Sequence, residues 1–359
     1  MVKNIVKYGL SIAIAGTFFW LAFKDFKESD FIELGRQLSN IDYRWLALTL
    51  ILMIASHVLR AWRWGVLLST VKETMSLKNL FNATMIGYAV NMVLPRVGEI
   101  TKSVNLAKQE SIDGKKVLAS VVVERILDTL MFALLLAASV FVFRVKINQA
   151  FGDVKLWGLT LSFEIAAYLI LLASLVILLV FTVISLYPAA VARLAQVLIH
   201  RVSKKWAERI SSALESFLEG TAALKNRTKY AEIVVSSWAI WGLYLLGTLT
   251  PFYAMGLNNA HVFGAPEALT TMSISGFGQL ITPAGAGTYQ YACTKTLEKI
   301  FDIPLIEASG YALLTFALTT VTNAVVGIGC ALSQNKDNFF RKPVASSDDL
   351  TMKELPQVK

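Results

Sequence analysis

Three ionisable residues lie inside an otherwise apolar stretch of the sequence. Glu124, Arg125 and Asp128 fall within the apolar run Val117–Phe143. In a helix, Glu124 and Asp128 are one turn apart and share a face, whereas Arg125 points about 100° away. Charges in such surroundings are costly, and they indicate ligand binding or proton transfer. Two structural alternatives are a network of salt bridges and side chains that extend to a membrane surface.

A second charged pair, Arg96 and Glu99, lies beside a helix-breaking proline and glycine. Pro95 and Gly98 predict a sharp break, since proline lacks a backbone donor and glycine permits tight turns. A half-helix that begins there presents free N–H groups to an anion. Because arginine suits phosphate geometry, we predict that Arg96 and Glu99 belong to a phosphate-headgroup site. Asn91 either bridges the broken backbone or contacts the ligand.

A similar break follows later in the chain. Pro283, Gly285 and Gly287 are expected to shape the backbone of a second tip, and Gln290 could hydrogen-bond a headgroup.

Arg60 and Arg63 alternate with tryptophans in Arg60-Ala61-Trp62-Arg63-Trp64. This pattern is typical of a membrane interface, with an aromatic belt and cationic side chains. Direct contact with a substrate is the alternative that we retain for both arginines.

The elements that position these residues are predicted to be membrane helices. Of the 359 residues, 55% are hydrophobic and only 16% are charged, which excludes an ordinary soluble fold. Runs near the 20 residues needed to cross a bilayer occur six times, at Ile5–Phe23, Trp45–Leu68, Val117–Phe143, Leu159–Leu186, Ile233–Met255 and Leu305–Leu332. The three histidines and two cysteines are scattered, so we expect no metal, no cofactor and no nucleic-acid partner.

The charge distribution predicts the orientation of these helices. Lys and Arg are most frequent in the segments that lie inside when both termini are cytoplasmic, which favours an N-in/C-in topology. The broken segments 80–108 and 268–300 then fit as two re-entrant helical hairpins that enter from opposite faces. The sequence therefore predicts an all-α polytopic membrane protein with about six transmembrane helices and two re-entrant hairpins.

The predicted segments form a single transmembrane domain, residues 1–333. It comprises a first inverted repeat at about 45–143, a cytoplasmic amphipathic segment at about 188–229 and a second inverted repeat at about 230–333. Residues 334–359 are polar and predict a disordered cytoplasmic tail. In inverted repeats, a substrate site is expected where the broken elements meet.

Four motifs together resemble the lysylphosphatidylglycerol synthase transmembrane-region family of flippase-like membrane proteins: Arg60–Trp64, Asn91–Glu99, Ala119–Asp128 and Thr282–Gly287. The resemblance implies a multi-pass protein that moves lipids between leaflets. Members that synthesise lysylphosphatidylglycerol carry an additional cytoplasmic transferase domain, which we do not expect here. At the second tip this chain departs from the family, which commonly has a glutamate where this chain has Gln290. Because Gln290 cannot titrate, no carboxylate role at that position is carried over from the family.

We therefore expect a lipid translocase of the cytoplasmic (inner) cell membrane that is not an enzyme. Its partners would be membrane lipids with an anionic phosphate headgroup, such as a polyprenyl phosphate or a phospholipid. The alternatives are a membrane-embedded enzyme acting on a lipid-linked substrate and an accessory scaffold for lipid or glycan synthesis.

Overall fold

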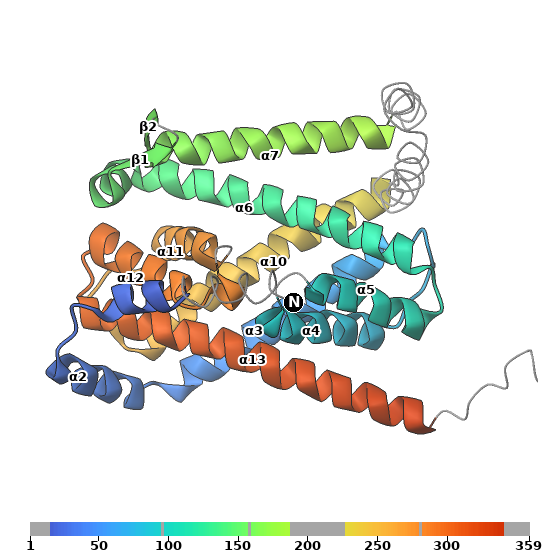
Figure 1. Ribbon diagram of the computed structural model, residues 1–359, viewed down its shortest axis with the longest axis horizontal. Helices are drawn as coiled ribbons and strands as arrows, with labels where there is room; N and C mark the ends of the chain where they lie inside the picture. Colours follow the sequence, from blue (N-terminus) through green and yellow to red (C-terminus); the bar gives the residue numbers. More distant parts are fainter. Residues whose placement is uncertain (1–14, 95–96, 157–158, 187–226, 280–281, 341–359) are drawn as a thin grey trace, which may run out of the picture.

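The computed structural model describes residues 15–94, 97–156, 159–186, 227–279 and 282–340 (Figure 1). Residues 15–23 are helical. The elements that follow, in chain order, are α2 (Glu28–Ser39), α3 (Tyr43–Leu67), α4 (Leu77–Val93), α5 (Val97–Glu110), α6 (Gly114–Phe151), β1 (Asp153–Leu156), β2 (Leu159–Ser162), α7 (Phe163–Leu186), α10 (Arg227–Ala254), the 3₁₀ turn η2 (Leu257–Asn259), α11 (Ala265–Gln279), the 3₁₀ turn η3 (Pro283–Gly285), α12 (Thr288–Phe301) and α13 (Leu305–Phe340).

Aspartates define the starts of two long helices. The Asp42 carboxylate accepts a hydrogen bond from the Arg44 N–H at 2.8 Å before α3, and Asp113 accepts one from the Lys115 N–H at 2.9 Å before α6. Each bond satisfies an amide that has no partner within its helix. The start of each of these two helices is therefore set by local sequence as well as by packing.

Four helices are long and apolar enough to cross a membrane within the described residues. They are Tyr43–Leu67, Gly114–Ala150, Thr228–Ala254 and Leu305–Gln334, which match four of the six predicted runs. Many large apolar side chains on their surfaces are exposed, as are those on α7, which packs along α6. Lipid is the solvent that suits such a surface.

Two pairs of short helices lie where the sequence predicts the two re-entrant hairpins, and each pair is called a hairpin below for its helix–break–helix order. In the first pair, α4 packs beside α5, and in the second, α11 packs beside α12. These helices have 14 to 17 residues, fewer than a bilayer crossing requires. The prediction of two helix–break–helix units is confirmed, and their entry into the membrane from opposite faces stays a prediction.

Glycines allow the two helices of each hairpin to approach closely. A Cβ atom at Gly98 of α5 would lie 2.0 Å from the carbonyl oxygen of Gly87 on α4. A Cβ atom at Gly278 of α11 would lie 2.6 Å from the carbonyl oxygen of Thr288 on α12. Side chains larger than hydrogen at these points would force each hairpin apart.

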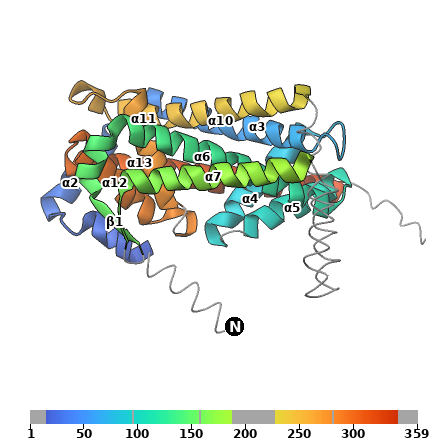
Figure 2. The same cartoon turned by 90° about the horizontal axis from the view of Figure 1, so that it is seen from above.

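The contacts of the first half have counterparts in the second. Helices α3 and α10 lie side by side along one edge of the molecule (Figure 2). The first hairpin packs through α4 on α13, and the second packs through α11 on α6. The order of one long, two short and one long helix thus occurs twice, while the inverted repeat itself stays a prediction.

Each half has its own buried core. In the first, Trp64 of α3 and Leu68, the residue that follows α3, pack with side chains of α4, α5 and α6. In the second, Phe252 of α10 packs with side chains of α11, α12 and α13. The polar groups described below lie beside the first of these cores.

Several predicted boundaries were wrong. The run Leu159–Leu186 does not begin as a helix, because residues Leu159–Ser162 pair with Asp153–Leu156 as an antiparallel ribbon that turns the chain from α6 into α7. Helix α6 continues past the predicted end at Phe143, where the backbone is only locally non-helical (φ −111°, ψ 24°). Helix α2 was not predicted.

The predicted tail was also placed too early, since α13 continues to Phe340. The rest of the tail, most of the amphipathic segment 188–229 and most of the first run, Ile5–Phe23, lie outside the described residues.

Candidate functional site

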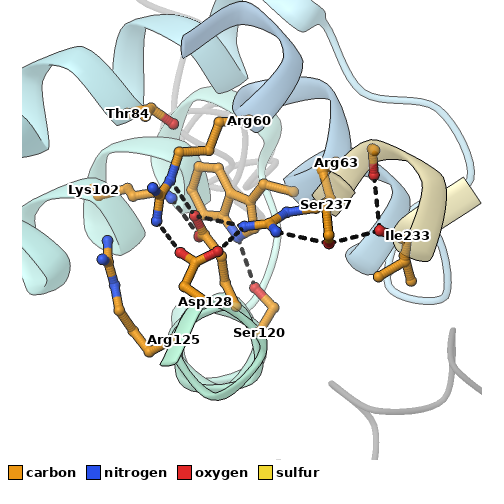
Figure 3. A network of polar contacts seen from close by, with 12 residues as sticks. Arg60, Arg63, Thr84, Lys102, Ser120, Arg125, Asp128, Ile233 and Ser237 are labelled. Atoms are coloured by element: carbon orange, nitrogen blue, oxygen red, sulfur yellow. Dashed lines mark hydrogen bonds and ion pairs between the residues drawn. The ribbon is translucent and has the colours of Figure 1, made fainter. Parts of the chain in front are cut away.

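A cluster of charged side chains lies between α3, α5, α6 and α10 (Figure 3). Arg60 and Arg63 come from α3, Lys102 from α5, and Glu124 and Asp128 from α6. Arg63 and Glu124 have no solvent-accessible surface, and Lys102 has a relative exposure of 2%. We refer to these five residues as the charged cluster.

Arg60 joins both carboxylates of the cluster. Its Nε donates to Glu124 Oε1 at 2.9 Å, and its Nη2 donates to Asp128 Oδ2. Its remaining terminal nitrogen, Nη1, donates to the Tyr244 hydroxyl of α10 at 3.1 Å. The guanidinium also lies 5.8 Å from the ring centroid of Tyr88 on α4. The planar donor set of Arg60 is thereby occupied by acceptors from α6 and α10, and the ring of Tyr88 on α4 lies nearby.

Arg63 is held by the Asp128 carboxylate and by a side chain of α10. Its Nη2 donates to Asp128 Oδ1 at 2.5 Å, and its Nη1 donates to Ser237 Oγ at 2.9 Å. Its Nε is buried and has no acceptor among the described residues. A buried donor without an acceptor is costly in a completed structure, so Arg63 retains a binding capacity that the described side chains do not use.

Lys102 completes the cluster from the first hairpin. Its Nζ donates to Glu124 Oε2 at 2.6 Å and lies 3.9 Å from the ring centroid of Trp64. The indole Nε1 of Trp64 donates to Ser120 Oγ at 2.9 Å, which fixes the ring orientation. Glu124 therefore accepts from Arg60 with one oxygen and from Lys102 with the other.

The charges in the cluster do not cancel. Arg60, Arg63 and Lys102 carry three positive charges, whereas Glu124 and Asp128 carry two negative charges. A surplus positive charge within an apolar bundle favours the entry of an anion.

The cluster also lies well inside its helices. Counted at ~1.5 Å per residue, Arg60 is about 10 Å from the end of α3, and Glu124 is about 15 Å from the start of α6. Glu124 is fully buried and both of its oxygens accept from cations of the cluster, so it does not extend outward to a surface as one predicted alternative had it.

A further ion pair lies at the accessible edge of the cluster. Arg125 Nε is 3.1 Å from Glu99 Oε1, and these side chains have relative exposures of 37% and 34%. Asp128, at 14%, is the more exposed of the two cluster carboxylates.

At the first tip, Asn91 has the backbone-bridging role. Its Oδ1 accepts from the Gly98 N–H at 2.8 Å, so the side chain of α4 caps the start of α5. Pro95 and Arg96 lie outside the described residues, and substrate contact by Arg96 stays a prediction.

At the second tip, the glycines shape the backbone as predicted. Gly285 and Gly287 adopt φ angles of +77° and +78°, which glycine tolerates best. Pro283 begins the 3₁₀ turn η3. Gln290 is buried, and its Oε1 accepts from the Gly287 N–H at 2.7 Å, a capping role within the hairpin. Its contact with a headgroup stays a prediction.

The structure corrects the interfacial interpretation of Arg60 to Trp64. Arg63 and Trp64 are fully buried, and Arg60 has an exposure of only 7%, so these side chains form no surface belt. Trp62, at 40%, is the exposed exception. The charge of Glu124 and Asp128 on the neighbouring helix explains the inward direction of both arginines.

Sequence reasoning missed Lys102 and Tyr244. A signal for Lys102 existed, because it follows Glu99 by three residues on the predicted half-helix and a charge there is as costly as those on α6. Nothing in the sequence distinguishes Tyr244 from the other aromatic residues of its run. Within the described residues, no group of three or more His, Cys, Asp or Glu side chains is close enough to hold a metal ion.

Comparison with known proteins identifies relatives among membrane proteins. The chain is 24% identical over 298 residues to UPF0104 membrane protein MJ1595 of Methanocaldococcus jannaschii, covering 81% of this chain and 84% of that protein. It is 23% identical over 314 residues to glycosyltransferase AglD of Haloferax volcanii, covering 83% of this chain and 50% of AglD. The chain thus spans about half the length of AglD.

No solved structure matches the chain significantly. The family model described as "Lysylphosphatidylglycerol synthase TM region" matches residues 8–327, nearly the whole chain. Together with the apolar helices, this match shows a multi-pass integral membrane protein, and the chain belongs to the lysylphosphatidylglycerol synthase transmembrane-region family.

Proposed function

We propose that this protein moves a phosphate-bearing lipid between the leaflets of the cytoplasmic membrane. The observation that carries the proposal is the surplus positive charge of the buried charged cluster. A lipid headgroup must leave water to cross the bilayer, and an unpaired phosphate in hydrocarbon is very unfavourable. Buried arginines provide such a headgroup with hydrogen bonds and an opposite charge midway.

The cluster has the chemistry to exchange a carboxylate for a phosphate. Arginine presents a planar set of donors that can pair with two phosphate oxygens at once. In the empty protein, Asp128 occupies donors of both Arg60 and Arg63. Because Asp128 is the more exposed carboxylate, we propose that the headgroup enters beside it and takes over those donors.

The Glu99–Arg125 pair lies where such a headgroup would arrive. Its side chains are about one-third exposed, so the pair can open at little cost in free energy. We propose that Arg125 receives the headgroup first and passes it inward to Arg60.

The two hairpins support the proposed route. Helical breaks at membrane depth are tolerated where protein or a polar cavity satisfies the backbone. In transporters with inverted repeats, the substrate site lies between the broken elements. Here Lys102 of the first hairpin faces Glu124 inside the bundle, which connects the hairpin directly to the proposed site.

The second candidate is an enzyme that acts on a lipid-linked substrate. It is favoured by the name of one relative, glycosyltransferase AglD, although the aligned segment is only half of that protein. The same experiment separates the two candidates, because a translocase leaves the lipid chemically unchanged.

Reconstitution into vesicles tests the proposal. Vesicles of phosphatidylcholine with a trace of fluorescent phosphatidylglycerol are treated with dithionite, which bleaches only the outer leaflet. The protein should make the protected half of the label accessible within minutes, and the recovered lipid should have its original mass. Arg63→Gln should slow this movement by about tenfold or more, whereas Arg36→Gln on exposed α2 should not.

Two results would contradict the proposal. If vesicles with the protein lose no more fluorescence to dithionite than protein-free vesicles do, the protein does not move this lipid. If the recovered lipid has a new mass, the enzyme is the better interpretation.

A further inference from the structure

We infer that Lys102 makes the site selective for lipids whose headgroup carries a net negative charge. The inference rests on the proposed function and deepens it, because it names the residue that distinguishes an anionic lipid from a zwitterionic one. A phosphate is present in both kinds of lipid, so recognition of phosphate by Arg60 and Arg63 does not separate them.

The charge count isolates Lys102. Arg60 and Arg63 together balance Glu124 and Asp128, and each arginine contacts Asp128. Lys102 is the third cation, and it shares Glu124 with Arg60. Without Lys102 the cluster would be neutral, and with it the cluster has a surplus of one positive charge.

Lys102 also has donor capacity that the protein does not use. An ammonium group has three N–H donors. In the described part of the chain, Nζ has one acceptor, Glu124 Oε2, and one aromatic neighbour, the ring of Trp64. A ligand oxygen can therefore bind Lys102 without displacing Glu124.

The hairpin positions this lysine closely. A Cβ atom at Gly87 would lie 3.0 Å from Lys102 Cβ and 2.9 Å from the Gly98 carbonyl oxygen. The close approach of α4 and α5 thus leaves Lys102 little freedom to withdraw, and its long side chain is directed into the bundle, where it is 2% exposed. The other four residues of the cluster come from α3 and α6, so the first hairpin contributes the surplus charge through Lys102.

The zwitterion provides the comparison. A phosphatidylcholine headgroup brings its own quaternary ammonium, which the surplus charge repels, whereas phosphatidylglycerol brings only the phosphate charge. At short range and in partly buried surroundings, one unit charge changes a binding equilibrium by about tenfold or more. The surplus on Lys102 is therefore sufficient to set the preference.

The experiment compares two fluorescent lipids in the same vesicles of phosphatidylcholine. The measured quantity is the ratio of initial rates for labelled phosphatidylglycerol and labelled phosphatidylcholine. Wild-type protein should favour phosphatidylglycerol, Lys102→Met should lower the ratio by about tenfold, and Lys102→Arg should keep it. Lys299→Met, which removes an exposed lysine of α12, is the matched control and should not change the ratio.

A charge-restoring variant makes the test specific. Lys102→Met combined with Glu124→Gln leaves Arg60 and Arg63 against Asp128, so the surplus returns to one positive charge. The double variant should recover most of the lost preference. If the single variant loses the preference and the double variant does not regain it, the surplus charge is not the cause and the inference is overturned.

The remaining outcomes separate this inference from the proposed function. If wild-type protein moves neither lipid, both are overturned. If wild-type protein moves lipids and Lys102→Met keeps the wild-type ratio, only the inference about Lys102 is overturned. Should Lys102→Met fail to fold, Glu124→Gln alone raises the surplus to two and must raise the ratio; an unchanged ratio overturns the inference.

Discussion

Arg60 and Glu124 are 64 residues apart in the sequence, and they meet inside the helical bundle through a 2.9 Å hydrogen bond from Nε to Oε1. Glu124 has no exposed surface, and its second oxygen accepts from Lys102. This carboxylate is therefore the common partner of two cations from different helices. Removal of the Glu124 carboxylate would leave Arg60 and Lys102 in an apolar environment with fewer partners.

The first prediction follows from that arrangement. Removal of one member of a buried ion pair typically costs about 3–5 kcal/mol, because the remaining charge loses its partner. We expect Glu124→Ala to lower the free energy of unfolding by about this amount and to lower the thermal midpoint of the detergent-solubilised protein. The control is Glu33→Ala, which breaks an exposed ion pair on α2 and should leave the midpoint unchanged. Equal midpoints for Glu124→Ala and wild type would show that the cluster contributes no stability.

The sequence was sufficient to predict part of this site. The spacing of Glu124 and Asp128 placed them on one helix face, and both carboxylates do accept from Arg60. That prediction depends only on the 3.6-residue period of a single helix. The charge of Lys102 on the predicted half-helix was a usable signal, but its pairing with Glu124 depends on how α5 packs against α6, which no local pattern contains.

The second prediction concerns the close approach within the first hairpin. Gly98→Ala would place a Cβ atom 2.0 Å from the Gly87 carbonyl oxygen, so α4 and α5 must separate. Overpacking of this kind typically costs about 1–3 kcal/mol, and we expect a corresponding fall in thermal stability. The separation would also displace Lys102, so the phosphatidylglycerol preference should weaken.

The matched control for this variant is Gly247→Ala on α10. A Cβ atom there would meet no atom within 4 Å, and alanine favours a helix over glycine by about 0.5–1 kcal/mol. We expect this variant to be as stable as wild type or slightly more stable. If both alanine variants behave alike, the close helix approach is not what requires Gly98.

The third prediction concerns pH. Glu110, the last residue of α5, accepts from Lys72 Nζ at 2.5 Å and from Asn79 Nδ2 at 2.7 Å. Burial would raise the pKa of the Glu110 carboxyl, but these hydrogen bonds outweigh it and hold the pKa below its ordinary value of 4.5. The ionised form therefore stabilises the fold at neutral pH. That contribution is complete above pH 4.5 and is lost as pH falls through the lowered pKa of the folded state.

Thermal unfolding across pH measures this contribution. Glu110→Gln should be less stable than wild type by about 1 kcal/mol near neutral pH, and the difference should shrink as pH falls below 4.5. Lys72→Met removes the cationic partner and should show the same pH window. If the difference in stability between Glu110→Gln and wild type instead grows in acid, the folded protein stabilises the protonated form of Glu110, and the prediction is wrong.

The breaks in the chain were predicted more accurately than the ends of its helices. Proline and glycine fix backbone geometry locally, so the tips at Gly98 and at residues 283–287 could be located without knowledge of the fold. The end of α6 could not, because its apolar run is followed by charged residues that remain helical up to Gly152. There Lys146 donates to the carbonyl oxygen of Ile300, a tertiary contact that helps to anchor the extension.

The last prediction tests whether both hairpins return to the face from which they enter. Val97, at the first tip, and Ala284, at the second, have exposed side chains and are suited to cysteine substitution. The native Cys293 and Cys330 are buried, so they can be replaced by alanine with few consequences for the surface. In that background, a membrane-impermeant maleimide should label Val97→Cys only from the cytoplasmic face and Ala284→Cys only from the outer face.

Positions in two loops serve as references for this topology measurement, because the face on which each loop lies does not depend on how the tips are arranged. Glu73→Cys, between α3 and α4, should be labelled from the same face as Val97→Cys, and Asn258→Cys, between α10 and α11, from the same face as Ala284→Cys. In a full crossing, each tip would instead react from the face opposite to its loop marker. That result would make α4, α5, α11 and α12 ordinary short spans, and it would remove the inverted hairpins from the proposed route.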